Sequence, residues 1–310
     1  MKIDVRSLVS PALDRARGRL GQRDINWTPD FMGFGNQLYL WCWAHDRRFD
    51  AQEPKVLINE RTRPWLPEVP GFAREFLLER DDVSLWDRRG HYWAEKEKIS
   101  GYPQGFSPDA RTAFVERLAQ EPLLAGVGHT DLAGPDVLTV NVRRGDYYSV
   151  AAHRSWFAID LASYLDRAIR GSVDRDGPVA RIHLVSDDPR WCLEHVPGLK
   201  ACAAELTVSP AGDPAQHFRD VCGSRRLVVS NSTFSIWGAF ISRTLIEQDP
   251  GMIWAPAFFQ STYGEGRCFE YDQDFSFVNE LPDGWQPDWV LSGAESPGPP
   301  GSTRAGGALG

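Results

Sequence analysis

The stretch VLTVNVRRGDYYSV, residues 137–150, decides the fold. It opens with a run of aliphatic and β-branched residues ending at Val142, which predicts a buried strand. Arg143, Arg144, a glycine and Asp146 follow at once. Charged groups at the carboxyl end of a buried strand are typical of a ligand site in an open α/β sheet. A surface ion pair between the second arginine and the aspartate, at a turn, is the alternative.

Strand and helix patterns alternate from this stretch onward. The strand-like segments ARIHLVSDD (residues 180–188) and RRLVVSNS (225–232) alternate with the helix-like segments SWFAIDLASYLDRAIRGS (155–172) and TFSIWGAFISRTL (233–245). Such alternation predicts an α/β fold, in which helices cover both faces of a parallel sheet.

The part of the chain before residue 137 is predicted to contain both helices and a strand. Residues 1 to about 25 read as a basic amphipathic helix, and residues 31–48 as a glycine-bearing turn followed by an apolar, aromatic helix. Residues 54–60 read as a short strand. Ser107 before Pro108 marks the N-cap of a further helix.

The chain divides into three parts. A glycine-bearing loop at residues 124–136 suggests a boundary, which gives one domain over residues 1–134 and a second over residues 135–291. The last part, residues 292–310, is rich in Gly, Pro and Ser and is predicted to be a disordered tail.

The bulk properties exclude several classes of protein. With 310 residues, a formal net charge of -8 and a pI near 5.4, the chain is unlike a general nucleic-acid binder. It has no apolar run long enough for an integral membrane span and no signal-peptide pattern at its start. The five cysteines form no zinc-binding pattern, so we expect reduced thiols in a cytoplasmic protein.

The predicted sheet gathers polar residues at one edge, because parallel strands deliver their carboxyl ends to the same side. These residues are Arg143, Arg144, Asp146, Asp187, Asp188, Ser230, Asn231, Ser232, Thr233 and Ser235. The fork of an arginine suits a phosphate, and backbone N–H groups at a helix start attract an anion. Carboxylates accept from a ribose hydroxyl or a base. The edge therefore predicts a nucleoside diphosphate site.

Each of these signals also has a purely structural interpretation. The serines can be helix caps. Asp187 and Asp188 precede Pro189 and can simply start a helix. Two D-x-D triplets, residues 174–176 and 272–274, are of the kind that holds a metal in other transferases. Neither follows an apolar strand, so no metal site is expected.

At these residues the sequence resembles the bacterial α-1,2-fucosyltransferase family and, more distantly, the α-1,6-fucosyltransferases and protein O-fucosyltransferases. Three blocks match in order: GFGNQLYLWCWAH (residues 33–45), VNVRRGDYYSV (140–150) and VVSNSTFSIWGAFIS (228–242). HLVSDDPRW (183–191) is a weaker match. The resemblance extends from about residue 31 to 259, most of the chain.

The resemblance implies a GT-B-like fold, with two Rossmann-type halves facing each other across a cleft. The amino-terminal domain, residues 1–134, would serve the acceptor, and residues 135–291 would bind GDP-fucose as the donor substrate. The implied reaction moves L-fucose from GDP-β-L-fucose to a hydroxyl of a glycan or glycoside acceptor with inversion, in an α-1,2 linkage. Neither a cofactor nor a metal is implied.

Site residues follow from the edge and the resemblance together. By resemblance, Arg143 binds the β-phosphate and stabilises the leaving GDP. Asp146, at the same strand end, is the first candidate for the general base, with His45 and His153 as alternatives. The candidate donor-binding residues are Gly33, Gly35, Asn36, Gln37, Asn141, Arg144, Asp187, Ser230, Asn231, Ser232, Thr233 and Ser235.

Two positions depart from the family pattern. Asn141 stands where the family has a histidine, and Ile236 where it has the first of two tryptophans. They keep open a transferase of the same fold that uses another nucleotide sugar, and a non-catalytic protein that binds one. An aromatic segment, residues 90–106, has groups that suit a sugar or the packing of a loop. The oligomeric state and the identity of the acceptor are left open by the sequence.

Overall fold

The computed structural model describes residues 13, 15–21, 23–50, 53–90, 106–246, 249–262, 266 and 272–294. Most of the predicted amino-terminal helix, nearly all of the aromatic segment at residues 90–106 and the tail from residue 295 lie outside these ranges. Residues 15–20 are helical, but the strand that begins at Arg23 occupies the end of the segment expected to be helical.

The first half of the molecule is built on a four-stranded sheet in the order β3-β2-β1-β4, with parallel neighbours throughout. Its strands are β1 (Arg23–Asn26), β2 (Glu53–Leu57), β3 (Leu77–Leu78) and β4 (Arg88–Arg89). Its helices are α2 (Phe34–Asp46), η1 (Arg63–Glu68), α3 (Pro70–Phe76) and η2 (Arg80–Asp82). The predicted strand at residues 54–60 and the predicted helix after the glycine turn are both confirmed.

The second half is built on a six-stranded, all-parallel sheet in the order β10-β9-β8-β5-β6-β7. Its strands are β5 (Val137–Val142), β6 (Arg181–Ser186), β7 (Glu205–Val208), β8 (Arg226–Val229), β9 (Ile253–Pro256) and β10 (Ser276–Val278). All six residues of β5 are buried, as its apolar run predicts.

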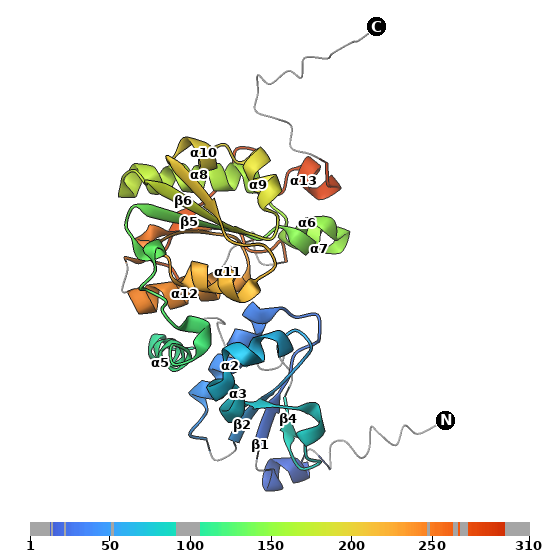
Figure 1. The fold of residues 1–310 in the computed structure, drawn as a ribbon. Coiled ribbons are helices and arrows are strands. Elements are labelled where there is room, and N and C mark those ends of the chain that lie inside the picture. The colour runs from blue at the N-terminus through green and yellow to red at the C-terminus, as the bar shows by residue number, and fades with distance from the viewer. Residues whose placement is uncertain are drawn as a thin grey trace, which may run out of the picture.

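Helices cover both faces of this second sheet (Figure 1). The helices of this half are α6 (Gly145–Ser149), α7 (Ala151–Phe157), α8 (Leu161–Asp176), α9 (Pro189–His195), α10 (Gly198–Ala201), α11 (Pro214–Cys222), α12 (Thr233–Ile246) and α13 (Asp288–Ser292). Of these, α8, α9 and α10 lie on one face of the sheet and α11 and α12 on the other. Short 3-10 turns occur at η3 (Pro122–Leu124), η4 (Asp131–Ala133) and η5 (Pro250–Met252). With two parallel sheets in separate halves, the molecule has the predicted α/β, GT-B-like architecture.

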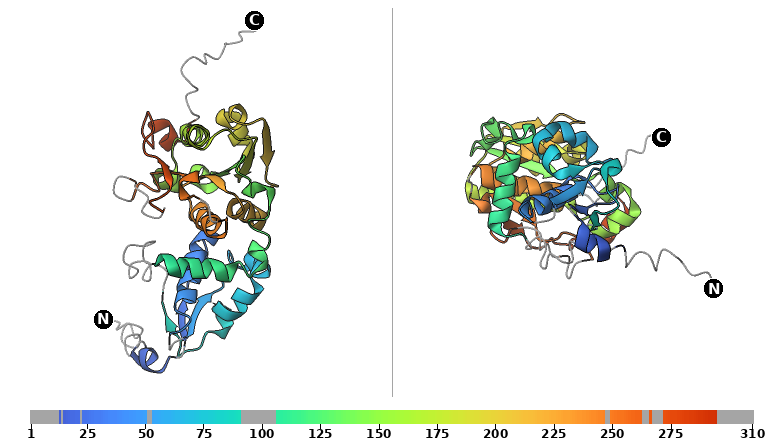
Figure 2. Two further views of the ribbon diagram at one scale, coloured as in Figure 1. Left: turned by 90° about the vertical axis from the view of Figure 1, so that its left-hand side faces the viewer. Right: turned by 90° about the horizontal axis from the view of Figure 1, so that it is seen from below.

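The two halves meet through helices α2, α11 and α12, which share one apolar core. Phe34 of α2 packs edge to face on Phe218 of α11, with ring centroids 5.2 Å apart. Tyr39 of α2 contacts Trp237 of α12 in the same way, at 5.0 Å. Helix α5 (Pro108–Leu118) lies across this junction, as the left view of Figure 2 shows, and its Phe114 also packs on the tryptophan.

The prediction of one continuous helix beginning at Ser155 is wrong about where the helix starts. Helix α7 ends at Phe157, and α8 begins only at Leu161. The break has a local cause, because the carboxylate of Asp160 caps α8 by accepting from the Ser163 N–H at 3.1 Å. The predicted cap at Ser107 is confirmed, since its hydroxyl accepts from Ala110 at 3.1 Å.

Within the described ranges, no helix is both long and apolar enough to span a membrane. Four cysteines lie there as free thiols, at positions 42, 192, 202 and 222, whereas Cys268 lies outside. Burial raises the pKa of Cys42 and Cys222 well above the usual value, which keeps both as inert thiols.

Candidate functional site

The site lies where the strand order of the second sheet reverses. Counted from β5 along the chain, the six strands have the order 3-2-1-4-5-6, in which β5 and β8 are neighbours and their connections leave in opposite directions. Open α/β sheets bind ligands outside the carboxyl ends of strands at such a point. Arg143 follows β5 directly, and Ser230 follows β8.

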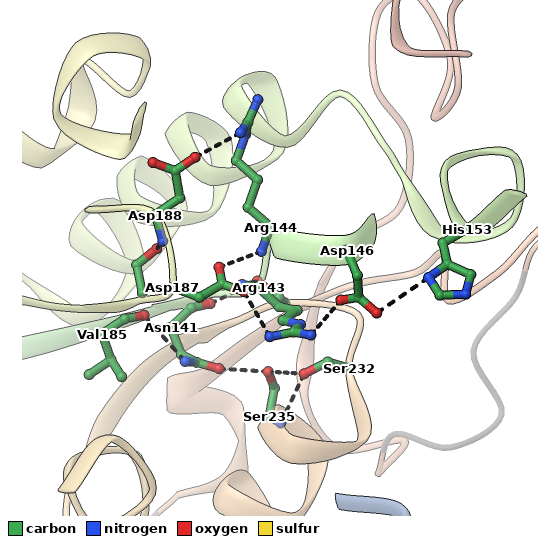
Figure 3. A network of polar contacts seen from close by, with 12 residues as sticks. Asn141, Arg143, Arg144, Asp146, His153, Val185, Asp187, Asp188, Ser232 and Ser235 are labelled. Atoms are coloured by element: carbon green, nitrogen blue, oxygen red, sulfur yellow. Dashed lines mark hydrogen bonds and ion pairs between the residues drawn. The ribbon is translucent and has the colours of Figure 1, made fainter. Parts of the chain in front are cut away.

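Arg143 is held between two carboxylates at this edge (Figure 3). Its Nη1 donates to Asp187 Oδ2 at 2.8 Å, and its Nη2 donates to Asp146 Oδ1. Burial lowers the pKa of Arg143, but the two carboxylates outweigh that effect and raise the pKa above its usual value. The guanidinium is therefore a permanent, fixed positive charge.

The anticipated local ion pair between Arg144 and Asp146 is wrong. Arg144 turns the other way, and its Nη1 donates to Asp188 Oδ2 at 2.7 Å. Its guanidinium lies 4.7 Å from the ring centre of Trp191 and 5.1 Å from that of Tyr148. An arginine between two aromatic rings and paired with a carboxylate is suited to holding α6 against α9.

The adjacent aspartates have separate roles. Asp188 caps α9 by accepting from the Trp191 N–H at 3.2 Å, so its interpretation as a helix start is confirmed. For Asp187 that interpretation is wrong, because its Oδ1 accepts from the backbone N–H of Arg144 at 2.8 Å. A Cβ added at Gly145 would lie 2.6 Å from Asp187 Oδ2, which explains why a glycine follows the arginines.

The serines that follow β8 form buried hydrogen bonds beneath the edge of the sheet. Ser230 Oγ accepts from the Arg143 N–H at 2.9 Å and donates to the Asn141 carbonyl at 2.9 Å. Ser232 caps α12 by accepting from the Ser235 N–H at 3.2 Å, which confirms the cap interpretation for this residue. Ser235 Oγ donates to Asn141 Oδ1 at 2.6 Å. These three serines are buried, and their hydroxyls fix β5 to the start of α12.

Asn141 and Asn231 are also engaged inside the protein. The Asn141 amide donates to the Val185 carbonyl at 3.3 Å, next to the bond from Ser235. The amide of Asn231 donates to the carbonyls of Phe157 and Phe259, at 2.8 and 2.9 Å. Asn231 thus ties α7 and the segment after β9 to the site. Thr233, by contrast, is half-buried.

The glycine-bearing turn of the first half reaches this same point. A Cβ added at Gly35 would lie 2.4 Å from the backbone nitrogen of Phe234 and 2.6 Å from Thr233 Oγ1. The amino termini of α2 and α12 therefore touch. At Gly33 an added Cβ would meet nothing within 4 Å, so this backbone faces open space. Gln37 instead points inward, is fully buried and donates to Thr28.

The fourth predicted residue of that turn, Asn36, lies in the first turn of α2 and donates its backbone N–H to the Gly33 carbonyl at 3.1 Å. The predicted candidates from the two halves, except the inward-pointing Gln37, are therefore brought to one region. Their roles as donor contacts stay a prediction.

The two histidines considered as alternative general bases differ in their exposure to solvent. His153 of α7 is part-exposed, with its Nδ1 3.3 Å from Asp146 Oδ2. His45 lies buried in the core of the first half between Phe76 and Phe114, with ring centres 5.9 and 6.0 Å away. Burial, with help from Arg48 and Arg117, lowers the pKa of His45 to about 4. Buried in this way, His45 is not placed to accept a proton from a substrate.

Both D-x-D triplets lie at the edge opposite the site. Asp174 and Asp176 belong to the end of α8, before β6 begins, and Asp176 pairs with Arg175 at 2.7 Å. Asp272 and Asp274 precede β10 and both face Arg243. Within the described ranges, no group of three or more His, Cys, Asp or Glu side chains has the arrangement of a metal site.

Two aromatic residues near the site were not predicted as site residues from the sequence. Trp191 belongs to the weaker matching block, and its contact with Arg144 depends on the packing of α9 on the sheet. Trp156 is 47% exposed on α7, one turn after His153. The sequence analysis expected a helix that begins at Ser155, so the position of Trp156 one turn after His153 on α7 was missed.

Two parallel α/β halves, with a fixed arginine and a helix amino terminus at the switch point, are suited to a glycosyltransferase that uses a nucleotide sugar. Residues 128–245, which contain β5 to β8 and nearly all of α12, match the family model described as "Glycosyl transferase family 11". Over these residues the chain is similar to this family of glycosyltransferases.

Other comparisons give distant likenesses. No curated protein matches the sequence. Among solved structures, the chain is similar to "E. coli heptosyltransferase WaaC with ADP", with 12% identity over 84% of this chain and 94% of that one and a TM-score of 0.44. It is also similar to "POFUT1 in complex with GDP", with 13% identity over 72% and 95% and a TM-score of 0.43. Scores at this level support no argument about the site.

Proposed function

We propose that the protein moves L-fucose from GDP-β-L-fucose to a hydroxyl of a glycan or glycoside, with inversion and in an α-1,2 linkage. The observation that carries the proposal is the position of Arg143 within the region that matches the family 11 model. Arg143 stands at the switch point, bonded to Ser230 just before α12, and the first residues of α12 touch the glycine turn of α2.

The chemistry needs positive charge at the diphosphate. As the bond from the sugar to the phosphate breaks, negative charge grows on the leaving GDP, and preorganised donors there accelerate the reaction. Two of the five N–H groups of Arg143 hold Asp146 and Asp187, which fixes the plane of the guanidinium. Its other N–H groups would serve a phosphate, together with the backbone N–H groups at the start of α12.

The test is the release of GDP from GDP-β-L-fucose in excess EDTA, in the wild type and in Arg143→Ala. We expect slow release in the wild type and a decrease of about 10²–10³-fold in the variant, the usual effect of removing one such donor. Arg144→Ala is the matched control, because this arginine faces Asp188 instead.

Each other outcome has a definite meaning. If GDP binds but is never released from the sugar nucleotide, the protein is a binding protein that kept the fold. If GDP does not bind and calorimetry detects another nucleotide, the donor is a different nucleotide sugar. Asn141, in place of the histidine of the family pattern, is the residue that would then explain the change.

A further inference from the structure

We infer that α7 forms the acceptor side of the site: His153 takes the proton of the acceptor hydroxyl, and Trp156, one turn further along, stacks on the apolar face of the acceptor sugar, for which lactose is the probe. The inference rests on the proposed function and adds to it the residues that activate and hold the acceptor.

The first support is the chain of contacts from Arg143 through Asp146 to His153 (Figure 3). Asp146 uses Oδ1 for the Arg143 guanidinium and has Oδ2 3.3 Å from His153 Nδ1. A carboxylate with one oxygen on a guanidinium and the other facing an imidazole is suited to orienting both side chains. Asp146 is therefore better placed as a positioning residue than as the general base.

The second support is the orientation of the imidazole. Nδ1 is covered, whereas the side chain of His153 is 41% exposed, so the exposed part of the ring is its other edge. With Nδ1–H directed at Asp146, Nε2 carries the lone pair that accepts a proton. The Nδ1 contact lies just outside hydrogen-bond geometry, and such catalytic contacts are often long in structures without substrate.

The charged surroundings of His153 are simple among the described residues. Asp146 of α6 faces it, and Arg143 lies behind that carboxylate. Arg154, on the same helix, turns away and donates to the Tyr148 carbonyl at 2.8 Å. An imidazolium formed during the reaction would thus be stabilised by the adjacent carboxylate.

The third support is Trp156. Residues at i and i+3 share a helix face, so this exposed indole belongs to the same face of α7 as His153. Its backbone is fixed, because its carbonyl accepts from the Ser261 N–H at 2.9 Å and Ser261 Oγ donates to the Ser155 carbonyl at 2.9 Å. A large aromatic face on the same helix face as a proton acceptor suits the C–H face of a sugar ring.

The step balances without a further reactant. The acceptor oxygen forms a bond to the anomeric carbon of fucose, and its proton passes to His153 Nε2. The bond between that carbon and the phosphate oxygen breaks, and its electron pair leaves with GDP beside Arg143. The imidazolium then returns its proton to water.

The experiment compares His153→Ala, His153→Gln, Trp156→Ala and the control His129→Ala, a histidine on an exposed loop. GDP release from GDP-β-L-fucose is followed with water alone and with lactose, and GDP affinity is measured by calorimetry. We expect both His153 variants to keep the GDP Kd and to lose about 10²–10⁴-fold in kcat, the usual effect of removing a general base. Free imidazole should partly restore His153→Ala.

Trp156→Ala should raise the KM for lactose by about tenfold, with a smaller change in kcat. Unchanged kcat in the His153 variants, or kcat lost together with GDP affinity, would overturn the role of this residue. Lactose that does not accelerate GDP release from the wild type, or an unchanged KM in Trp156→Ala, would overturn the stacking. A wild type that neither binds nor releases GDP would instead contradict the proposed function itself.

Discussion

Two adjacent arginines of the site have opposite surroundings. Arg143 lies between Asp146 and Asp187 at the strand edge, where a phosphate would arrive. Arg144 is directed at Asp188 and lies over the ring of Trp191. Because both arginines belong to one motif, the sequence alone does not distinguish their surroundings, whereas their contacts do.

Arg144→Ala is expected to cost stability and to leave donor binding nearly intact. The variant loses a half-exposed ion pair and two cation–π contacts, together worth about 1–2 kcal/mol. Urea unfolding measures the loss, and calorimetry with GDP measures the affinity. A tenfold weaker GDP Kd with unchanged stability would show that Arg144 binds the donor after all.

For single residues, the sequence predicted which side chains gather at the edge but did not predict their hydrogen-bond and ion-pair partners. Arg143 and the serine run were found, because their positions follow from strand ends in a parallel sheet. The partner of Arg144 was missed, because Asp188 comes from another strand end and competes with the nearby Asp146. The departure at Ile236 has a simple explanation in the fold: the side chain is fully buried in the core.

Helix α2 and helix α12 approach each other most closely at their amino termini. Gly35→Ala places a methyl group against the backbone of Phe234, which cannot give way without moving α12. We expect a loss of about 1–3 kcal/mol in the free energy of unfolding, as for other overpacked contacts. Urea denaturation followed by circular dichroism measures it.

Gly33→Ala is the matched control, since its added methyl group meets nothing within 4 Å and its φ of -72° suits any residue. It should change the stability by less than about 0.5 kcal/mol, as surface substitutions usually do. Equal losses in the two variants would mean that the contact with α12 does not explain the effect of Gly35→Ala.

Elements were predicted well where the pattern was local and strong. The alternation after residue 135 gave the strands, and the caps gave the start of α5. The short helices α6 and α7 were missed, because a five-residue and a seven-residue helix have too little periodicity to be recognised. Their position depends on tertiary contacts, such as those of Asn231 with the Phe157 and Phe259 carbonyls.

The molecule as a whole is expected to unfold in one step. Leu38 of α2 and Trp237 of α12 are fully buried in the same apolar cluster, although they belong to different halves. Unfolding one half would expose the core surface of the other, which couples them. Tryptophan fluorescence and far-UV circular dichroism should give coincident urea transitions. Two separated transitions would show that the halves are stable independently.

Acid should destabilise the whole fold through His45. Its pKa of about 4 in the folded protein lies below the ordinary value of about 6.5 expected for the unfolded chain. Between these values the unfolded chain binds a proton that the folded protein does not, so stability is full above pH 6.5 and is lost as the pH falls towards 4. At pH 4.5 the loss from this residue is about 2–3 kcal/mol.

The measurement is the free energy of unfolding at pH 7 and pH 4.5, in the wild type and in His45→Gln. Other groups titrate in this range in both proteins, so the difference between the two acid losses isolates His45. We expect the variant to lose about 2–3 kcal/mol less than the wild type, and the control His129→Gln to behave as the wild type does. Identical losses in the wild type and His45→Gln would mean that the pKa of His45 is not lowered in the folded protein.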